Sequence, residues 1–390
     1  MKIIFFCPNI LRDAHRRIFQ LDRLKEENYD FVFLDATAYY NNSATATDEL
    51  ILKNRKKCSS LADFKNFREQ LPQEPALYVS FDQYMQFAAP VLDILVRKKD
   101  KVLTYHTKRF SSVHIPSSSI RKFTDNAIRK LDKVLPLHLL KQYYRRRYGF
   151  FVPDYFLCST SNLVPTKIFF SVKRKNRIIV HSDDINHTLE NKPAVFDTSK
   201  KVGVFLDQVM PYQTILHPGI EQETPPVGYK EYYYEQLAGC LKSLKNELDL
   251  DEIVIALHPD AVKFADEVQE SFKNFRTFIG MTHELIRDSE VVFAHSSTAL
   301  GWAIYHQKPV VLLKEEYLMR QLMGKYITFF EENLGFETYP MENKKEKTTP
   351  QLLIDHQKYK DYTMKFLKDN KIRENSYYYA FNYIKKDISG

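Results

Sequence analysis

VVFAHSSTALGWAIYHQKPVVLL, residues 291–313, combines two short apolar runs with a helix-compatible stretch between them. The runs VVFA (291–294) and PVVLL (309–313) are almost continuously apolar, which is typical of strands buried on both faces of a parallel sheet. STALGWAIYHQ (297–307) predicts the helix that two parallel strands need between them. The segment therefore predicts a strand–helix–strand unit, with PVVLL as the last strand of its sheet.

The same alternation precedes this segment, from residue 202 onwards. Further strands are predicted at VGVFLD (202–207), EIVIAL (252–257) and RTFIG (276–280). Helices are predicted between them, at residues 230–248, 261–275 and 282–289, and Thr282 would cap the last of these. Strands that alternate with helices in this way predict a doubly wound parallel sheet.

The first half of the chain shows a second set of apolar runs with long crossovers between them. The predicted strands are Lys2–Cys7, Phe31–Leu34, Leu77–Phe81, Val102–Tyr105, Tyr155–Cys158 and Arg177–His181. The fold class is therefore predicted as α/β, with two Rossmann-like, doubly wound parallel-sheet domains and a C-terminal helical tail.

The domain boundaries are predicted from the polar segment DTSKK (197–201), which separates the two sets of strands. Residues 1–196 would form the first domain, residues 197–340 the second, and residues 341–390 a helical tail that docks across both. A chain of 390 residues agrees with this division, since domains have about 150 residues each.

The positive charge of the chain is concentrated in one segment. The net charge is +8, and residues 121–149 hold nine basic residues against two acidic ones, with leucines and tyrosines among them. Such a stretch predicts peripheral contact with an anionic membrane surface; a solvated helix face is the alternative. Nucleic acid is not expected as a partner, because no nucleic-acid-binding motif accompanies the charge.

The remaining composition predicts a cytoplasmic protein. MKIIFFCPN (1–9) is too short for a signal peptide, and no run reaches the roughly 18 apolar residues of a membrane span. The four cysteines, which include Cys7 and Cys158 at the ends of apolar runs, form no CxxC pair and no zinc pattern. We therefore expect buried thiols in a reducing compartment, at the inner face of the cytoplasmic membrane if residues 121–149 bind it.

Polar residues follow four strands of the second predicted sheet. Ligands of open α/β sheets bind beyond the carboxyl ends of the strands, so these residues are the candidate site. They are Asp207 and Gln208 after the first strand, His258 and Pro259 after the second, Thr282, His283 and Glu284 after the third, and His295, Ser296, Ser297 and Thr298 after the fourth.

Each of these residues has a chemical and a structural interpretation. Ser296, Ser297 or Thr298 would cap the following helix, and the same hydroxyls and N–H groups could bind a phosphate. His258 could donate a proton to a leaving phosphate or bond within its own turn, where Pro259 suits a first helical position. Asp207 could act as a base or nucleophile, or cap its loop.

Taken together, these strand ends predict a site for transferring a sugar from an activated nucleotide. The histidine and the hydroxyls would neutralise the leaving phosphate, and a carboxylate would act on the acceptor or on the anomeric carbon. The ten glycines form neither a Walker nor a Rossmann fingerprint, so a glycine-rich phosphate loop is not expected.

The motifs resemble those of a known enzyme group. His258–Pro259 followed by Ser296–Ser297 resembles the His–Pro and Ser–Ser/Thr motifs of bacterial sialyltransferases and Kdo transferases, which have the GT-B fold. VFLDQVMPY, GMTHEL and HSDDIN (181–186) are similar to segments of bacterial surface-carbohydrate biosynthesis proteins. The likeness is clear over residues 175–315 and extends to the first 170 residues in rhythm only.

The resemblance implies a glycosyltransferase that moves a 2-keto-3-deoxy acid sugar, of sialic, Kdo, pseudaminic or legionaminic type, from a CMP donor. The acceptor would be a glycan or lipid-linked glycan of a bacterial surface polysaccharide, such as lipopolysaccharide or capsule, bound by the first domain. The donor would bind to the second domain. Neither metal nor cofactor is implied, since a CMP donor has a single phosphate.

The resemblance also implies roles for the site residues. His258 would be the acid or phosphate partner, Glu284 would bind the ribose, and Asp207 would be the base or nucleophile. The nucleotide site would consist of His258, Pro259, Thr282, Glu284, His295, Ser296, Ser297 and Thr298. Asp183, Asp184 and Gln208 are further candidates for the base or for acceptor contact.

Two other functions fit the same residues. One is a GT-B enzyme, transferase or epimerase, that uses UDP or another nucleoside diphosphate sugar. The other is a non-catalytic scaffold that binds a nucleotide or a glycan in a polysaccharide assembly.

Overall fold

The structure is a computed structural model of the full chain. It describes residues 1–8, 14–41, 46–81, 85–106, 142, 145, 149, 151–159, 171–189, 192–197, 199–212, 224–342, 348–367 and 372–389.

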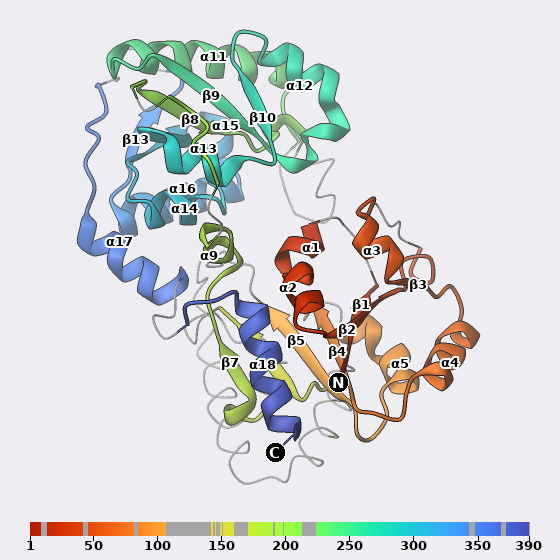
Figure 1. The fold of residues 1–390 in the computed structure, drawn as a ribbon. Coiled ribbons are helices and arrows are strands. Elements are labelled where there is room, and N and C mark those ends of the chain that lie inside the picture. Colours follow the sequence, from red (N-terminus) through yellow and green to blue (C-terminus); the bar gives the residue numbers. More distant parts are fainter. Residues whose placement is uncertain are drawn as a thin grey trace. The chain divides into compact units, whose positions relative to one another are not determined.

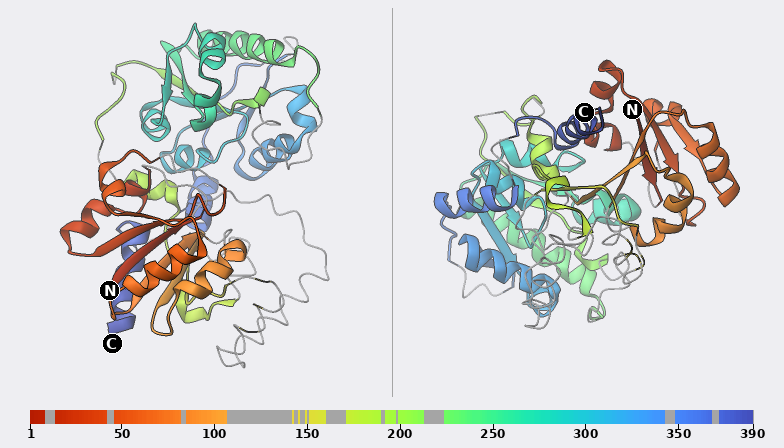
Figure 2. Two further views of the ribbon diagram at one scale, coloured as in Figure 1. Left: turned by 90° about the vertical axis from the view of Figure 1, so that its right-hand side faces the viewer. Right: turned by 90° about the horizontal axis from the view of Figure 1, so that it is seen from below.

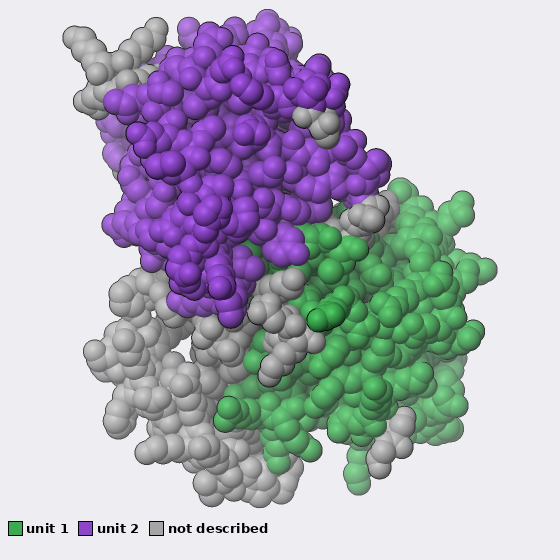
Figure 3. All heavy atoms as spheres, turned by 60° about the vertical axis from the view of Figure 1, so that its left-hand side comes forward, with its two compact units in different colours: residues 1–189, 366–390 green, residues 190–365 purple. Residues whose placement is uncertain are grey.

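Two compact units make up the chain, and they are coloured separately in Figure 3. Unit 1 contains residues 1–189 and 366–390, and unit 2 contains residues 190–365. The polypeptide therefore passes from unit 1 to unit 2 and then back again. The sequence-based boundary lay at residue 197, and the helical tail expected from residue 341 is divided between the two units.

Unit 1 is built on a seven-stranded parallel sheet with the order β3-β2-β1-β4-β5-β6-β7. Every pair of neighbouring strands is parallel. The strands are β1 (Lys2–Cys7), β2 (Asp30–Asp35), β3 (Arg55–Lys57), β4 (Ala76–Phe81), β5 (Lys101–His106), β6 (Tyr155–Cys158) and β7 (Arg177–Ile179). The chain winds outward from β1 in one direction and restarts with β4 in the other, which makes the sheet doubly wound.

Helices cover both faces of this sheet, as Figures 1 and 2 show. They are α1 (Ala14–Ile18), α2 (Leu21–Glu26), α3 (Glu49–Lys53), α4 (Leu61–Gln70), α5 (Met85–Leu95), α9 (Asp183–Thr188) and α18 (Ser376–Ser389), with a 3₁₀ turn at Arg174–Asn176. Alternate side chains of β1 enter two different cores. Ile4 and Phe6 pack with residues of α4 and α5, whereas Ile3 and Phe5 pack with residues of α2 and α18.

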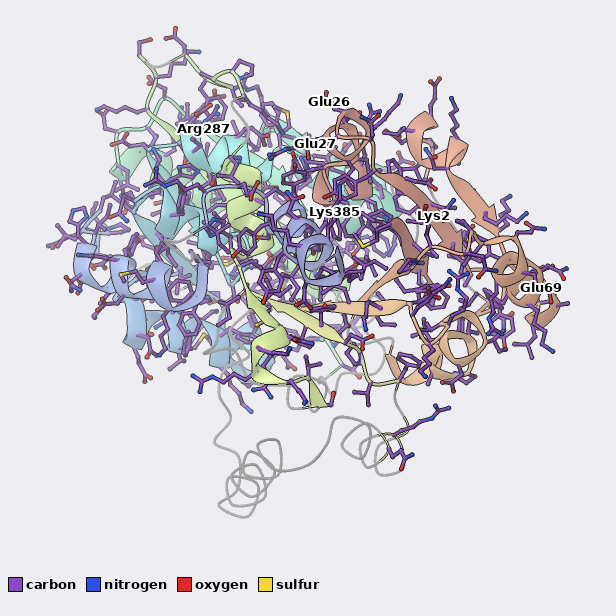
Figure 4. The ribbon with its side chains drawn as sticks, turned by 60° about the horizontal axis from the view of Figure 1, so that its bottom comes forward. Lys2, Glu26, Glu27, Glu69, Arg287 and Lys385 are labelled. Atoms are coloured by element: carbon purple, nitrogen blue, oxygen red, sulfur yellow. The ribbon has the colours of Figure 1, made fainter. Side chains whose placement is uncertain are left out.

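The last helix, α18, supplies a large part of one core of unit 1. Phe381 and Ile384 are fully buried in it, and the ring of Phe381 lies 6.0 Å from that of Phe5 in an edge-on arrangement. Figure 4 marks Lys385 on this helix and Glu27 at the end of α2. A segment far along the chain thus completes the sheet that the first residues begin.

Unit 2 contains a six-stranded parallel sheet with the order β10-β9-β8-β11-β12-β13. The strands are β8 (Val202–Leu206), β9 (Glu252–Leu257), β10 (Thr277–Ile279), β11 (Val291–Ala294), β12 (Val310–Lys314) and β13 (Glu337–Pro340). This is again the Rossmann order, with the change of winding direction between β8 and β11.

The helices of unit 2 pack on both faces of its sheet (Figure 1). They are α11 (Tyr229–Glu247), α12 (Ala265–Ser271), α13 (Thr282–Asp288), α14 (Leu300–Tyr305), α15 (Glu316–Arg320), α16 (Leu322–Leu334) and α17 (His356–Tyr362), with 3₁₀ turns at Met210–Tyr212 and Pro259–Phe264. A π-helical turn at Thr363–Leu367 follows α17 and spans the boundary between unit 2 and unit 1. Phe205, Ile255 and Phe293 share one core with Leu237 of α11. The intervening strand residues point to the opposite face.

The predicted fold class is confirmed, since both halves are doubly wound parallel sheets and helices end the chain. One strand prediction was wrong: β12 is followed by β13, so PVVLL does not end its sheet. The strand β13 reads ETYP, in which only Tyr339 and Pro340 are largely apolar. It lies at the edge of the sheet, where a strand needs no continuous apolar run, so no such run marks it in the sequence. The all-basic edge strand β3 was missed for the same reason.

Other predictions concern the membrane and the thiols. Among the described residues, no helix is both long and apolar enough to span a membrane. Most of residues 121–149, the segment predicted to contact a membrane surface, lies outside the described residues. All four cysteines are buried and carry free thiols, as predicted for Cys7 and Cys158.

Candidate functional site

The candidate site lies at the carboxyl edge of the unit 2 sheet. The change of winding direction between β8 and β11 puts the residues after these two strands on either side of the place where open α/β sheets bind ligands. Asp207 follows β8, and His295 to Thr298 follow β11. The strand β9, which pairs with β8, adds His258 and Pro259 to the same edge.

Asp207 begins a strained turn. Its Oδ1 accepts the N–H of Val209 at 2.9 Å, and the N–H of Tyr212 donates to the Val209 carbonyl at 2.8 Å. Val209 is fully buried and has a φ of 49°, in the left-handed region that β-branched residues rarely adopt. Gln208 lies between these two residues. Packing and hydrogen bonds therefore hold this turn in one conformation.

Asp207 also joins the ends of β8 and β9. Its N–H donates to the Ala256 carbonyl at 3.0 Å, and its Oδ2 accepts the N–H of His258 in a longer contact of 3.4 Å. The side chain continues the face of Phe205 and is 4% exposed. Burial raises the pKa of Asp207 to about 6, although the N–H groups of Val209 and His258 act in the opposite direction.

His258 has a defined tautomer. Its Nδ1 accepts the N–H of Asp260 at 3.1 Å, so the proton of the neutral ring lies on Nε2. The side chain is 35% exposed, and Pro259 begins the 3₁₀ turn that follows, as predicted for a first helical residue. This tautomer has its hydrogen-bond donor at Nε2.

His295 points into the core instead of toward the sheet edge. It is fully buried; its Nδ1 donates to the Leu313 carbonyl at 2.7 Å, and its Nε2 accepts the hydroxyl of Tyr233 at 2.9 Å. Burial lowers the pKa of His295 to about 4, so the ring is neutral. The reason is the strand alternation, since His295 continues the inward face of Val291 and Phe293. His295 was predicted to be part of the nucleotide site, but in the structure it supports the strand end from inside the core.

The hydroxyl residues after His295 form a short turn before α14. Ser297 Oγ accepts the N–H of Ala299 at 3.2 Å, and the Ser297 carbonyl accepts the N–H of Leu300 at 3.2 Å. The helix begins at Leu300, so Ser296 to Thr298 precede it and Ala299 occupies its N-cap position. Ser296 is 4% exposed, and Ser297 and Thr298 are more exposed. The predicted capping by a hydroxyl thus acts on the turn before the helix.

Thr282 and Glu284 lie in the first turn of α13. Thr282 is already part of the helix, and Met281 holds the N-cap position without a side-chain hydrogen bond, so the predicted cap by Thr282 was wrong. Glu284 is 5% exposed and its Oε1 forms an ion pair with the ammonium group of Lys192. Burial alone would raise the pKa of Glu284, but the hydrogen bond from Lys192 brings it below the usual value.

The structure thus connects some predicted residues directly. Asp207 accepts the backbone N–H of His258. Tyr233 of α11 forms a hydrogen bond with His295. Glu284 is linked to Lys192. Lys192 and Tyr233 were missed from the sequence. Tyr233 could have been found, since it stands four residues before Leu237 on the buried face of α11.

The motif HSDDIN surrounds α9 in unit 1. The backbone of Asp183 and Asp184 is helical, but their side chains lie outside the described residues. The neighbouring residues hold the returning chain: Ser182 N–H donates to the Leu367 carbonyl at 2.8 Å, Ser376 N–H to Asn186 Oδ1 at 2.9 Å, and Ser376 Oγ to the His181 carbonyl at 3.0 Å. The motif therefore has a structural use in anchoring the C-terminal segment.

No group of three or more histidine, cysteine, aspartate or glutamate side chains with metal-binding geometry occurs among the described residues.

The comparisons with known proteins give distant likenesses to solved structures. No protein-family model matches the chain, and no curated protein is similar to it in sequence. The UDP-GlcNAc 2-epimerase of Methanocaldococcus jannaschii is 11% identical with a TM-score of 0.48 and full coverage of both chains. The wall teichoic acid polymerase TagF is 15% identical with a TM-score of 0.47, covering 100% of this chain and 88% of that one.

A third solved structure, the spinosyn forosaminyltransferase SpnP, is 12% identical with a TM-score of 0.41, covering 100% of this chain and 95% of that one. Likenesses this distant assign neither an activity nor a ligand to the chain.

Proposed function

We propose that the chain is a glycosyltransferase that uses a nucleotide-activated sugar and binds its nucleotide at the carboxyl edge of the unit 2 sheet. The observation that carries this proposal is His258, a partly exposed ring whose Nδ1 accepts a backbone N–H, which assigns the ring proton to Nε2. It stands at the edge where such sheets bind nucleotides.

The proposed reaction places His258 beside a phosphate of the donor. The acceptor hydroxyl attacks the anomeric carbon, the bond from that carbon to the phosphate oxygen breaks, and its electron pair leaves with the nucleotide. Negative charge develops on the phosphate in this step, and the Nε2–H of His258 stabilises it by a hydrogen bond. Ser297 and Thr298, in the turn after His295, would supply further donors.

We assign Asp207 a positioning role in this proposal. Its carboxylate is 4% exposed and accepts backbone N–H groups, including that of His258, so it holds the end of β9 in place. Both carboxylate oxygens of Asp207 are occupied by backbone N–H groups, which favours a different group as nucleophile or base. Asp183 and Asp184 stay candidates for the base that takes the proton of the acceptor hydroxyl.

The donor is proposed to be a nucleoside diphosphate sugar, with UDP as the first nucleotide to test. This order agrees with the UDP-GlcNAc 2-epimerase among the structures of similar fold. A CMP-linked 2-keto-3-deoxy acid sugar is the second candidate, because His258–Pro259 and Ser296–Ser297 resemble the motifs of CMP-sugar enzymes. Transfer without a metal is part of the proposal for the CMP donor.

Calorimetry with UDP and CMP tests the proposal, followed by transfer assays with sugars of whichever nucleotide binds. Replacing His258→Ala should reduce transfer at least 100-fold, the usual scale for one group that stabilises developing charge. His356→Ala is the matched control, since His356 is exposed on α17 and contacts Gln307. Its activity should equal that of the wild type.

The possible results separate the candidates. Binding of CMP without UDP would select the CMP donor. Nucleotide binding without transfer of any sugar, or unchanged transfer after His258→Ala, would favour the non-catalytic scaffold and overturn the proposed role of His258.

A further inference from the structure

Residues 192–195, which follow the passage of the chain into unit 2, are attached firmly to α13. Two N–H groups of Arg287 donate to the carbonyls of Lys192 and Pro193, each at 2.8 Å. The N–H of Val195 donates to Asp288 Oδ2 at 2.7 Å, and Asp288 itself pairs with Arg287 at 2.6 Å. Figure 4 labels Arg287. We call residues 192–195 the connector strap.

The strap carries one charged side chain toward the candidate site. The ammonium group of Lys192 pairs with Oε1 of Glu284, one turn before Arg287 on the same helix. The side chain of Glu284 is 7% exposed and that of Lys192 is 36% exposed. An ionised carboxylate buried to this extent needs a cation, and Lys192 is the one that contacts it. Arg287 and His283, on the same helix, also interact electrostatically with Glu284.

We propose that Lys192 is a positioning residue for the donor nucleotide, which keeps Glu284 ionised and oriented so that it can accept the ribose hydroxyls. This inference rests on the proposed function and extends it to a residue outside the strand-end motifs. The strap, which lies near the start of unit 2, would thereby contribute a residue to the nucleotide site of that unit.

The ion pair is expected to persist when a nucleotide binds. Ribose hydroxyls are neutral, so they cannot replace the charge of the ammonium group on a buried carboxylate. A carboxylate has about four lone-pair positions; Lys192 uses one on Oε1, and the backbone N–H of Glu284 itself uses a second. Glu284 can therefore keep Lys192 and accept two hydroxyls at once, which excludes a simple exchange of one for the other.

The charge balance of the site supports the same role. Asp207 and Glu284 are both acidic, and the His258 ring is neutral when Nδ1 accepts a backbone N–H. The phosphates of a donor add more negative charge to this edge. Without Lys192, the carboxylate of Glu284 would repel the donor phosphates, whereas with Lys192 the pair is neutral.

The test is the affinity for UDP, measured by calorimetry between pH 5 and pH 8. Lys192→Met should weaken binding about tenfold at pH 8, a value reduced from that of a fully buried pair because Lys192 is partly exposed. Without its cation, Glu284 takes up a proton at higher pH, so the loss of affinity on acidification should begin at higher pH than in the wild type. A purely structural role of Lys192 would not change the pH at which UDP affinity begins to fall.

Two variants serve as references. Lys192→Arg keeps the charge and should bind UDP nearly as the wild type does. Lys201→Met removes an exposed lysine that pairs with Asp249 at 2.8 Å, and it should leave UDP affinity and its pH dependence unchanged. Thermal unfolding of each variant separates lost binding from lost folding.

Lys192→Met leaves the buried Glu284 carboxylate without its contacting cation, which can prevent folding. The double variant Lys192→Met with Glu284→Gln covers this case, because it removes both charges of the pair. Its UDP affinity should equal that of Glu284→Gln alone. A further tenfold loss in the double variant, or unchanged affinity and pH dependence in Lys192→Met, would overturn the role of Lys192. Absence of binding by the wild type to both UDP and CMP would instead overturn the proposed function.

Discussion

The two sheets share the Rossmann strand order over six strands, to which unit 1 adds a seventh, but the residues after their strands have different uses. In unit 1, the residues after β7 anchor the returning chain, through Ser182 to Leu367 and through His181 and Asn186 to Ser376. In unit 2, the residues after β8, β9 and β11 bind mainly one another and α11. Polar residues at a strand end therefore have two uses, and only contacts distinguish them.

The sheets also differ in how their cores are completed. One core of unit 1 depends on α18, which lies more than 360 residues after β1, whereas the core of unit 2 that contains Phe205 is formed by residues 205–341. The same fold can therefore be completed locally or by a distant segment of the chain.

Phe381→Ala should have the largest effect, because it removes a fully buried ring from the core that α18 completes in unit 1. We expect a loss of about 3–5 kcal/mol in the stability of unit 1. Denaturant unfolding followed by circular dichroism measures it. Tyr383→Ala on the same helix, 40% exposed, is the control and should cost less than about 1 kcal/mol.

The sole tryptophan, Trp302 in α14, reports on unit 2 separately. Its fluorescence transition should stay in place in Phe381→Ala while the circular dichroism of unit 1 is lost earlier. An equal shift of the Trp302 transition would show that unit 2 depends on α18 as well.

Asp207→Asn should change the pH dependence of stability. The folded-state pKa of about 6 lies above the ordinary value of 3.8, so the folded state binds the proton more tightly. This contribution is fully present below about pH 4 and is lost as the pH rises through 6, by about 3 kcal/mol in total. An asparagine at this position does not titrate, so Asp207→Asn should not lose this stability as the pH rises.

Thermal unfolding at pH 4, 6 and 8 measures the difference between Asp207→Asn and the wild type. The variant should gain stability over the wild type as the pH rises, while the two should be more alike at pH 4. A difference that is constant with pH would contradict the raised pKa of Asp207.

Tyr233→Phe and Tyr234→Phe form a matched pair on α11. The Tyr233 hydroxyl donates to His295, so its removal should cost about 1–2 kcal/mol. The Tyr234 hydroxyl is buried without a hydrogen-bond partner among the described residues, so its removal should be neutral or stabilising by up to about 1 kcal/mol. Chemical denaturation measures both, and equal losses would contradict the assigned contacts.

Ser376→Ala and Ser297→Ala compare an anchor in unit 1 with a turn in unit 2. Each removes one side-chain hydrogen bond, from Ser376 to His181 or from Ala299 to Ser297, and should cost about 1 kcal/mol. Only Ser297→Ala should also weaken UDP binding, as measured by calorimetry. Weaker UDP binding in Ser376→Ala would contradict the distinction between the two strand ends.

Much of the fold could be predicted from apolar runs. β6, β9 and β11 have the bounds that the sequence suggested, because strands buried on both faces are almost continuously apolar. The edge strands β3 and β13 could not be predicted in this way, since an edge strand can expose charged side chains and needs fewer apolar residues. Helix starts shifted because α12 and α14 are preceded by turns.

The candidate site was predictable as a set of strand ends but not as a set of side-chain directions. His295 and Asp207 continue the inward faces of β11 and β8, and this alternation turns them toward α11. Lys192 could not be predicted, because it lies 92 residues from Glu284 and the contact depends on how the strap runs along α13.

The division of unit 1 into two stretches of chain has a consequence for biosynthesis. Residues 1–189 leave the ribosome first, yet the helix that covers one of their cores, α18, is made only after all of unit 2. Unit 2 is continuous from residue 190 to residue 365, so it can fold while unit 1 is still incomplete. The domain that is synthesised first is therefore the last to be finished, and until then its apolar face needs protection from aggregation.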